Sequence, residues 1–129
     1  MSPEPDGNGR RDLKDVSHLV PRVTPRLLAG IRDRIVDSFH PQKIVLFGSY
    51  AHGKPHAWSD VDLLVVMRSK ERMARRIMRV ARTAHVRFLP MDVLVFTPQE
   101  IRVRLARRDP FIREILSRGK VLYQRGKRR

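Results

Sequence analysis

Residues 46–66 read LFGSYAHGKPHAWSDVDLLVV, and this stretch decides the fold. It joins the end of an apolar run, KIVLF at 43–47, to a Gly48-Ser49 turn, and ten residues further on two aspartates open a second apolar run. Short runs of branched aliphatic residues bounded by turn residues are typical of buried strands. We therefore expect a strand over 43–47, a loop, and a second strand over 60–67.

The sequence on either side of this stretch alternates helices with strands. Thr24 is suited to cap a helix whose first residue is Pro25, and Ser69 to cap a second helix. Thr97 and Glu100 have the spacing of a capping box. With the apolar periodicity, these signals predict helices over 25–39, about 70–87, 98 to about 107 and 110–118, and strands over 91–96 and 121–123. Phe111, Ile115 and Leu116 are expected to form the apolar side of the last of these helices. This order predicts an α/β or α+β fold, a small mixed β-sheet flanked by helices.

The length and composition fit a single folded domain. The chain has 129 residues, of which 41% are hydrophobic and 32% charged. Residues 1–20 lack apolar periodicity, so we expect a flexible tail before a domain over 21–129. No apolar run approaches the roughly 20 residues of a membrane helix, and the N-terminus has no hydrophobic signal core, which predicts a cytoplasmic protein without membrane contact.

Cysteine and charge narrow the classes of function. The sequence has no cysteine, which excludes disulfides, thiolate zinc sites and a cysteine nucleophile. The net charge is +15, and residues 67–129 hold nineteen basic against five acidic side chains. Four arginines at helical spacing lie in this half, namely Arg72, Arg75, Arg79 and Arg82. This charge indicates either an anionic partner, nucleic acid or an acidic protein, or an ordinary solvated surface, and the sequence leaves both open.

The aspartates carry the chemistry. Asp60 and Asp62 are two apart on a predicted strand, so both carboxylates project from one face. Asp92 lies between apolar neighbours on the predicted strand 91–96 and is a third candidate ligand. Carboxylate oxygens bind hard cations such as Mg²⁺, and two such ions stabilise the attacking and leaving oxygens of a displacement at phosphorus. Without a cation, carboxylates held this close would repel each other.

The turn before the loop is suited to bind phosphate. Gly48 allows a ligand to approach the backbone closely, and the Ser49 hydroxyl with neighbouring N–H groups can hold a triphosphate.

The Gly-Ser turn, the Asp-apolar-Asp strand and the later apolar-Asp-apolar strand together resemble the DNA polymerase beta-type nucleotidyltransferase superfamily. The resemblance covers roughly 24–123, and the short chain is similar to the minimal nucleotidyltransferases. It implies that Asp60, Asp62 and Asp92 are the catalytic residues and hold two Mg²⁺ ions, and that Gly48, Ser49 and Ser59 bind the nucleotide. One departure is His52, which stands where members often have a basic residue, commonly arginine.

The same resemblance implies a substrate and a partner. Minimal nucleotidyltransferases are often antitoxins of HEPN-type ribonuclease toxins, and some adenylylate a tyrosine of the toxin. The expected function is therefore Mg²⁺-dependent transfer of AMP from ATP, or of another nucleotide from its triphosphate, to a hydroxyl of a macromolecular acceptor. Two alternatives stay open: an inactive antitoxin that acts by binding alone, and a basic nucleic-acid-binding module.

Several weaker patterns lie in the loop between the two strands. Residues 48–54 also read G-x-x-x-x-G-K, but Pro55 follows where a phosphate-binding P-loop needs a hydroxyl and a helix, which excludes that reading. His52 and His56 have no third nitrogen or sulfur ligand nearby, so surface histidines are favoured over a metal pair. Tyr50 and Trp58 could stack on a base, although simple packing is the more common role of single aromatics.

Overall fold

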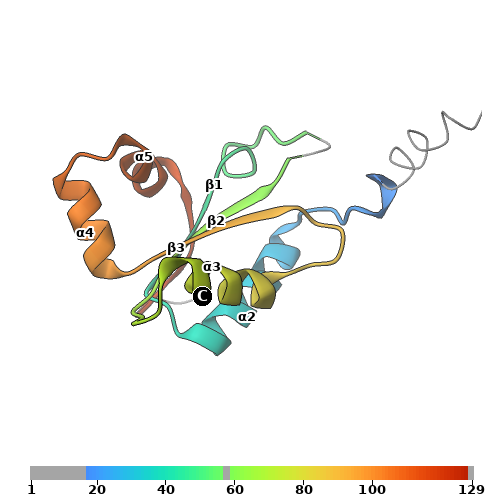
Figure 1. Ribbon diagram of the computed structural model, residues 1–129. Helices are drawn as coiled ribbons and strands as arrows, with labels where there is room; N and C mark the ends of the chain where they lie inside the picture. Colours follow the sequence, from blue (N-terminus) through green and yellow to red (C-terminus); the bar gives the residue numbers. More distant parts are fainter. Residues whose placement is uncertain (1–16, 57–58, 128–129) are drawn as a thin grey trace, which may run out of the picture.

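The structure is a computed structural model that describes residues 17–56 and 59–127 (Figure 1). Apart from a short 3-10 helix within the predicted tail, its elements follow one another as the sequence predicts. They are a short 3-10 helix η1 (Ser17–Leu19), α2 (Pro25–Phe39), β1 (Lys43–Phe47), β2 (Val61–Val66), α3 (Met73–Ala84), β3 (Met91–Phe96), α4 (Pro98–Ala106), α5 (Pro110–Arg118) and β4 (Lys120–Gln124). The predicted tail over 1–20 lies largely outside the described residues. Val20, at its end, packs against the core.

The four described strands form one mixed sheet in the order β3-β2-β1-β4. β1 pairs antiparallel with both β2 and β4, whereas β2 and β3 are parallel and are joined by α3. A parallel pair needs such a crossover, because the chain must return to the starting edge of the sheet. The predicted α+β architecture, a small mixed sheet flanked by helices, is confirmed.

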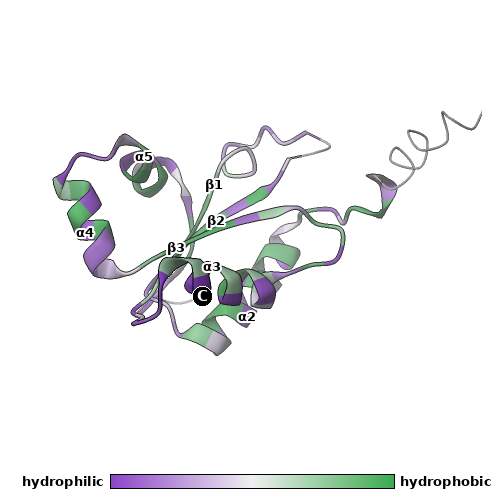
Figure 2. Ribbon diagram, in the orientation of Figure 1, coloured by the Kyte–Doolittle hydropathy of each residue, from purple (hydrophilic) through white to green (hydrophobic). Residues whose placement is uncertain are grey.

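The sheet separates two hydrophobic clusters. Because side chains alternate along a strand, Leu63 and Val65 enter the cluster shared with α2 and α3, while Leu64 and Val66 enter the cluster shared with α4 and α5. Figure 1 shows the two helix pairs on opposite sides of the sheet. Figure 2 shows that the strands are mainly hydrophobic whereas the helices carry hydrophilic stretches as well. None of the described helices combines the length and apolarity needed to cross a membrane.

The predicted caps of α2 and α4 are confirmed. The Thr24 hydroxyl accepts a hydrogen bond from the Leu27 amide at 3.1 Å, and α2 spans the predicted residues. Thr97 and Glu100 form a complete capping box at the start of α4. Each cap satisfies N–H groups that have no partner within the helix, which is why a local pattern fixes the helix start.

The predicted start of α3 was wrong. The helix begins at Met73, and the Ser69 hydroxyl instead accepts a hydrogen bond from the Glu71 amide at 3.0 Å, which closes a turn before the helix. One arginine of α3 is also not on the exposed face. Arg76 is 3% exposed and donates to both carboxylate oxygens of Glu100 on α4, at 2.8 and 3.0 Å.

The buried face of α5 also differs from the prediction, which placed Phe111 on the apolar side. Asp109 caps this helix by accepting from the Phe111 amide at 2.9 Å. Ile112 and Ile115 fill the core, while the ring of Phe111 is 53% exposed. Gly119 ends the helix with no room for a side chain, because a Cβ there would lie 2.4 Å from a methyl carbon of Val45. The helix therefore lies directly on β1.

Candidate active site

The three predicted aspartates lie at one end of the sheet. Asp62 is the second residue of β2, and the strand register places it between Phe47 of β1 and Asp92 of β3. Asp60 immediately precedes β2, two residues before Asp62 and so on the same face of the chain. Asp60 and Asp92 are exposed, whereas Asp62 is half-buried. The fold thus brings the carboxylates together across two neighbouring strands.

Gly48 lies against the central carboxylate. Its backbone has φ +75°, a conformation that other residues rarely adopt, and a Cβ built on it would lie 2.1 Å from Oδ2 of Asp62. The Gly48 carbonyl accepts hydrogen bonds from the amides of Ala51 and His52 at 3.1 and 3.3 Å, which close the turn after β1. A glycine is therefore required both by the backbone of the turn and by the space that Asp62 occupies.

The carboxylates repel one another. Partial burial, followed by the negative charges of Asp92 and Asp60, raises the pKa of Asp62 from 3.8 to about 6. A cation beside Asp62 would relieve both effects, and hard oxygen donors of this kind suit Mg²⁺. No three His, Cys, Asp or Glu side chains among the described residues already surround one point closely enough to hold an ion. Joint ligation therefore requires rotation of the exposed Asp60 and Asp92 side chains.

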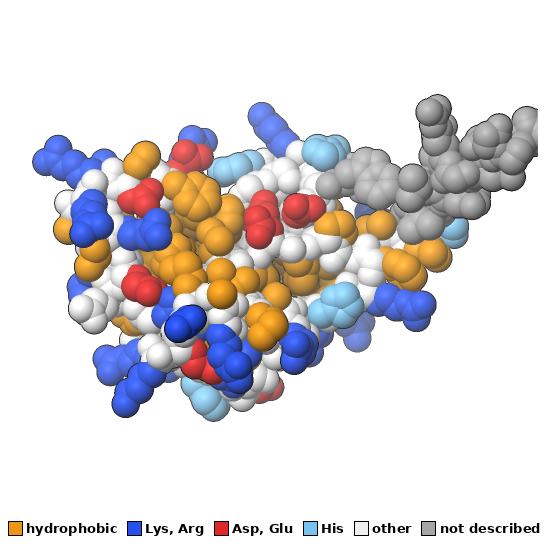
Figure 3. Space-filling view, in the orientation of Figure 1, with side chains coloured by type: hydrophobic (Ala, Val, Ile, Leu, Met, Phe, Trp, Pro, Cys, Tyr) orange, Lys and Arg blue, Asp and Glu red, His pale blue; other side chains and the backbone are white. Residues whose placement is uncertain are grey.

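A cavity of about 450 Å³ adjoins Asp62 and separates the Gly48 turn from α5. Its lining consists of Phe47, Gly48, Ser49, His52, Asp62, Phe111, Glu114, Ile115 and Gly119. Figure 3 shows acidic side chains beside hydrophobic ones on this face of the molecule, with Lys and Arg mainly around them. The combination of apolar walls and a few polar groups is typical of small-molecule sites of this size.

The remaining candidates of the loop have different positions. Ser49 and His52 line the cavity. Ser59 is buried, and its hydroxyl accepts a hydrogen bond from the His56 amide at 2.7 Å, so this side chain closes the loop before β2 and is not part of the cavity lining. Tyr50 packs against the core. Trp58 lies outside the described residues.

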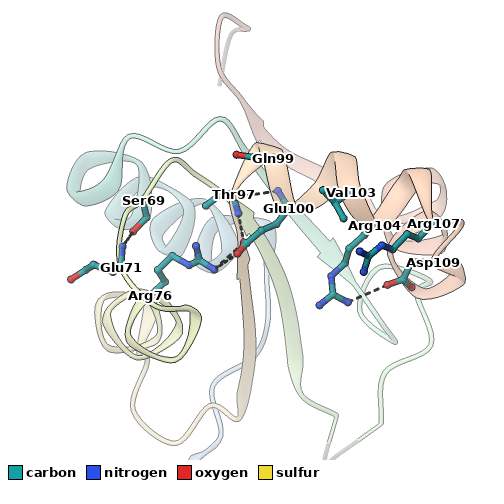
Figure 4. A pocket seen from close by; sticks show the side chains of 10 residues that line it. All are labelled: Ser69, Glu71, Arg76, Thr97, Gln99, Glu100, Val103, Arg104, Arg107 and Asp109. Atoms are coloured by element: carbon teal, nitrogen blue, oxygen red, sulfur yellow. Dashed lines mark hydrogen bonds and ion pairs between the residues drawn. The ribbon is translucent and has the colours of Figure 1, made fainter.

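A larger cavity, about 710 Å³, lies between α3 and α4 and contains none of the predicted site residues (Figure 4). Its charged groups are mainly engaged with each other. Arg76 pairs with Glu100, and Arg104 pairs with Asp109 at 3.1 Å. The larger volume of this cavity therefore does not make it the candidate active site, and the chemistry of the side chains favours the smaller cavity beside Asp62.

A comparison with protein families identifies this architecture. The model of the nucleotidyltransferase domain matches residues 28–122, which include all three aspartates and the Gly48 turn. The chain belongs to the nucleotidyltransferase domain family. Nucleotidyl transfer is thus its general activity and a nucleoside triphosphate its class of substrate, and the family usually uses a divalent metal.

A solved structure supports the fold of this nucleotidyltransferase domain. The chain is similar to a protein from Sulfolobus solfataricus that is described provisionally as a nucleotidyltransferase, with a TM-score of 0.57 and 21% sequence identity. The alignment covers 80% of this chain and 82% of that one. No curated protein matches the chain.

Two residues of the cavity were missed by the sequence analysis. Phe111 and Glu114 belong to α5, more than fifty residues after the Gly48 turn, and no spacing rule connects them to it. The available signal was their three-residue separation, which places them on the same side of a helix. That signal shows which residues lie together, but the fold is needed to show what they face.

Proposed function

We propose that this nucleotidyltransferase transfers AMP from ATP to a hydroxyl group of a macromolecular acceptor, with Asp60, Asp62 and Asp92 as the catalytic, metal-binding residues. The observation that carries the proposal is the position of Asp62. Its carboxylate is held against Gly48 and between two further carboxylates, at the mouth of a cavity. A cation bound there together with a polyphosphate would offset the repulsion between the carboxylates, and carboxylates held in such unfavourable proximity are typical of functional sites.

The proposed reaction is a displacement at the α-phosphorus of ATP. A bond forms between the acceptor oxygen and this phosphorus, the bond to the bridging oxygen of the β-phosphate breaks, and pyrophosphate leaves. Two Mg²⁺ ions, when bound, would supply charge neutralisation and lower the pKa of the acceptor hydroxyl. Asp92 is exposed at the start of β3, so its carboxylate is accessible to an incoming hydroxyl and can orient it and accept its proton.

The phosphates are assigned to the turn after β1. Gly48 lines the cavity without a side chain of its own, and Ser49 lines the same cavity. Ser59 would contribute through the loop that it holds in place. His52 also lines the cavity, where its imidazole would offer a hydrogen bond to a phosphate oxygen.

The proposed acceptor is a tyrosine of a HEPN-type toxin, for which this protein would be the cytoplasmic antitoxin. The support is the resemblance to minimal nucleotidyltransferases, together with the exposure of Asp60 and Asp92, which leaves the site open to a large acceptor. The basic second half of the chain would serve as the attractive surface for an acidic partner.

The test is transfer of label from ATP radiolabelled at the α-phosphate, with Mg²⁺, in the presence and absence of the HEPN-type protein. The informative variant is Asp60→Ala with Asp62→Ala, and Asp37→Ala on α2 is a matched exposed control. We expect label on the partner from the parent protein and the control, and none from the double variant or after chelation of the metal.

Other results would replace the proposal. Label transferred equally by the double variant would contradict the role of the aspartates. Unchanged partner binding without transfer would identify an antitoxin that acts by binding alone. Binding of nucleic acid that is insensitive to the double substitution, again without transfer, would identify a basic binding module.

A further inference from the structure

An exposed aromatic ring lies beside the catalytic carboxylates. Phe111 is the second residue of α5, and its ring is 53% exposed although the next residue, Ile112, is fully buried. The ring lines the cavity that also contains Asp62 and the Gly48 turn. An exposed aromatic ring that lines a cavity is a candidate surface for a flat ligand.

The ring has an aromatic neighbour that does not cover it. Phe47 contacts it edge to face, with 6.0 Å between the ring centroids and 87° between the planes. A perpendicular neighbour covers at most one face of a ring, so Phe47 leaves the other available for stacking. Phe47 is also the cross-strand partner of Asp62. The aromatic surface therefore begins directly beside the carboxylate at which the phosphates are expected.

A carboxylate lies next to this surface. Glu114 follows Phe111 by three residues on α5, which places both on one side of the helix, and both line the cavity. An ionised carboxylate only accepts hydrogen bonds, so it favours a ligand edge that carries N–H donors. It also repels phosphate, so the polyphosphate would lie toward Gly48 and the rest of the nucleotide toward α5.

We propose that α5 forms the nucleobase subsite of the enzyme, with the ring of Phe111 as the stacking surface and Glu114 as the acceptor for an exocyclic amino group of the base. This inference rests on the proposed function and adds the selection of the base to it. The cavity, at about 450 Å³, lies within the range of about 300–1,000 Å³ that ligand sites of proteins have. The subsite would favour adenine over bases that present only acceptors at that edge.

The test measures binding affinities for three ligands by calorimetry in Mg²⁺: ATP, the triphosphate of purine riboside, which lacks the amino group, and inorganic tripolyphosphate, which lacks the nucleoside. Phe111→Ala should weaken ATP binding roughly tenfold, because stacking on an aromatic side chain is worth that much or more, and should leave tripolyphosphate binding unchanged. Phe88→Ala is the matched control, since Phe88 is also exposed, at 41%, but does not line the cavity.

Glu114→Ala tests the hydrogen bond. The parent should prefer ATP to purine riboside triphosphate roughly tenfold, as expected for a hydrogen bond to a charged group, and the variant should bind both equally. The ratio of the two affinities removes any general effect of the lost negative charge, because both ligands carry the same phosphates.

The outcomes separate this inference from the proposed function. Tripolyphosphate that binds the parent as tightly as ATP, or unchanged ATP affinity in Phe111→Ala, would overturn the nucleobase subsite and leave the phosphate and metal site intact. Failure of ATP and tripolyphosphate alike to bind the folded parent would overturn the proposed function, and the subsite with it.

Discussion

Replacement of Gly48 by alanine should separate the two reasons for a glycine at this position. The first reason is the backbone, because φ +75° costs an L-residue about 1–2 kcal/mol. The second is space, because the new Cβ would lie 2.1 Å from Oδ2 of Asp62. The carboxylate must retreat by about 1 Å before the contact reaches even 3.0 Å, and overpacking of this kind costs about 1–3 kcal/mol more.

The catalytic role proposed for Asp62 adds a second expected effect, a loss of activity. A displacement of about 1 Å in a group that positions the reacting atoms can reduce a rate about 100-fold. We therefore expect Gly48→Ala to remain folded, to lose roughly 2–5 kcal/mol in its free energy of unfolding, and to lose about 100-fold in nucleotidyl transfer. Urea titrations and the label-transfer assay measure the two quantities on the same preparations.

Two other glycines provide matched controls. Gly53 and Gly126 have φ +70° and +85°, and neither has any atom within 4 Å of a built Cβ. Gly53→Ala and Gly126→Ala should thus show the backbone cost of about 1–2 kcal/mol alone. The excess loss of Gly48→Ala should disappear in an Asp62→Ala background, in which the clashing oxygen is absent. Equal losses at Gly48 and Gly126, or an excess that persists without the Asp62 carboxylate, would refute the reasoning.

Three further changes test other parts of the structure. Asp62→Asn, without metal, should raise the free energy of unfolding by about 1 kcal/mol, a value that allows for solvent screening of the half-buried carboxylate. Because the pKa of Asp62 is raised to about 6, this gain in stability should be absent below about pH 4, grow through pH 6 and then level off. A stability difference in urea titrations that does not depend on pH would contradict this reasoning. Glu100→Gln should destabilise the protein by about 2 kcal/mol at neutral pH, since it leaves Arg76 buried without its partner. Partial burial opposes ionisation of Glu100, but hydrogen bonds from Thr97 and Arg76 outweigh it and lower its pKa, so the stability difference between Glu100→Gln and the parent should shrink as the pH falls through that pKa. Arg76→Met should cost less stability because it removes the buried charge. Equal losses in the two variants would argue against an unpaired Arg76 charge as the cause. Gly119→Ala should lower the melting temperature, with a cost of about 1–3 kcal/mol, because its Cβ would meet Val45 at 2.4 Å, and an unchanged melting temperature would show that α5 can move off β1.

Local signals made most of the elements predictable from the sequence. The caps at Thr24 and Thr97 act within one turn of their own helix, so the residues that decide the helix start lie together in the sequence. β2, which directly follows Asp60 and contains Asp62, was predictable for the same reason. Alternation of apolar and acidic residues over a few positions reports one face of a strand.

Long-range contacts explain what could not be predicted. The sequence pattern did not single out Arg76, which is buried in the structure because Glu100, 24 residues later, pairs with it. Without that partner in view, an arginine in a helix is correctly assigned to the surface. The order of the strands is likewise a property of the whole sheet, and the sequence specified only that a mixed sheet would form.

The candidate site also combines residues that local sequence signals predict with residues that only the fold brings together. Asp60, Asp62 and the Gly48 turn were predicted from one short stretch, whereas the proximity of Asp92 depends on the parallel pairing of β2 with β3. Phe111 was misplaced because an apolar residue in a helix is most often buried, and only the packing of Ile112 and Ile115 shows that the core is filled without it.

The parallel register that aligns Asp62 with Asp92 has a consequence for how such enzymes can change in evolution. The register is fixed by the alternation of buried side chains, so a one-residue slip would turn Asp92 to the opposite face of the sheet. Extra residues in the connection between α3 and β3 are tolerated, because a longer surface loop adds little to the entropy of closure. Lineages of this domain should therefore vary freely in length between Ala84 and Met91, and insertions within β2 or β3 should accompany loss of transfer.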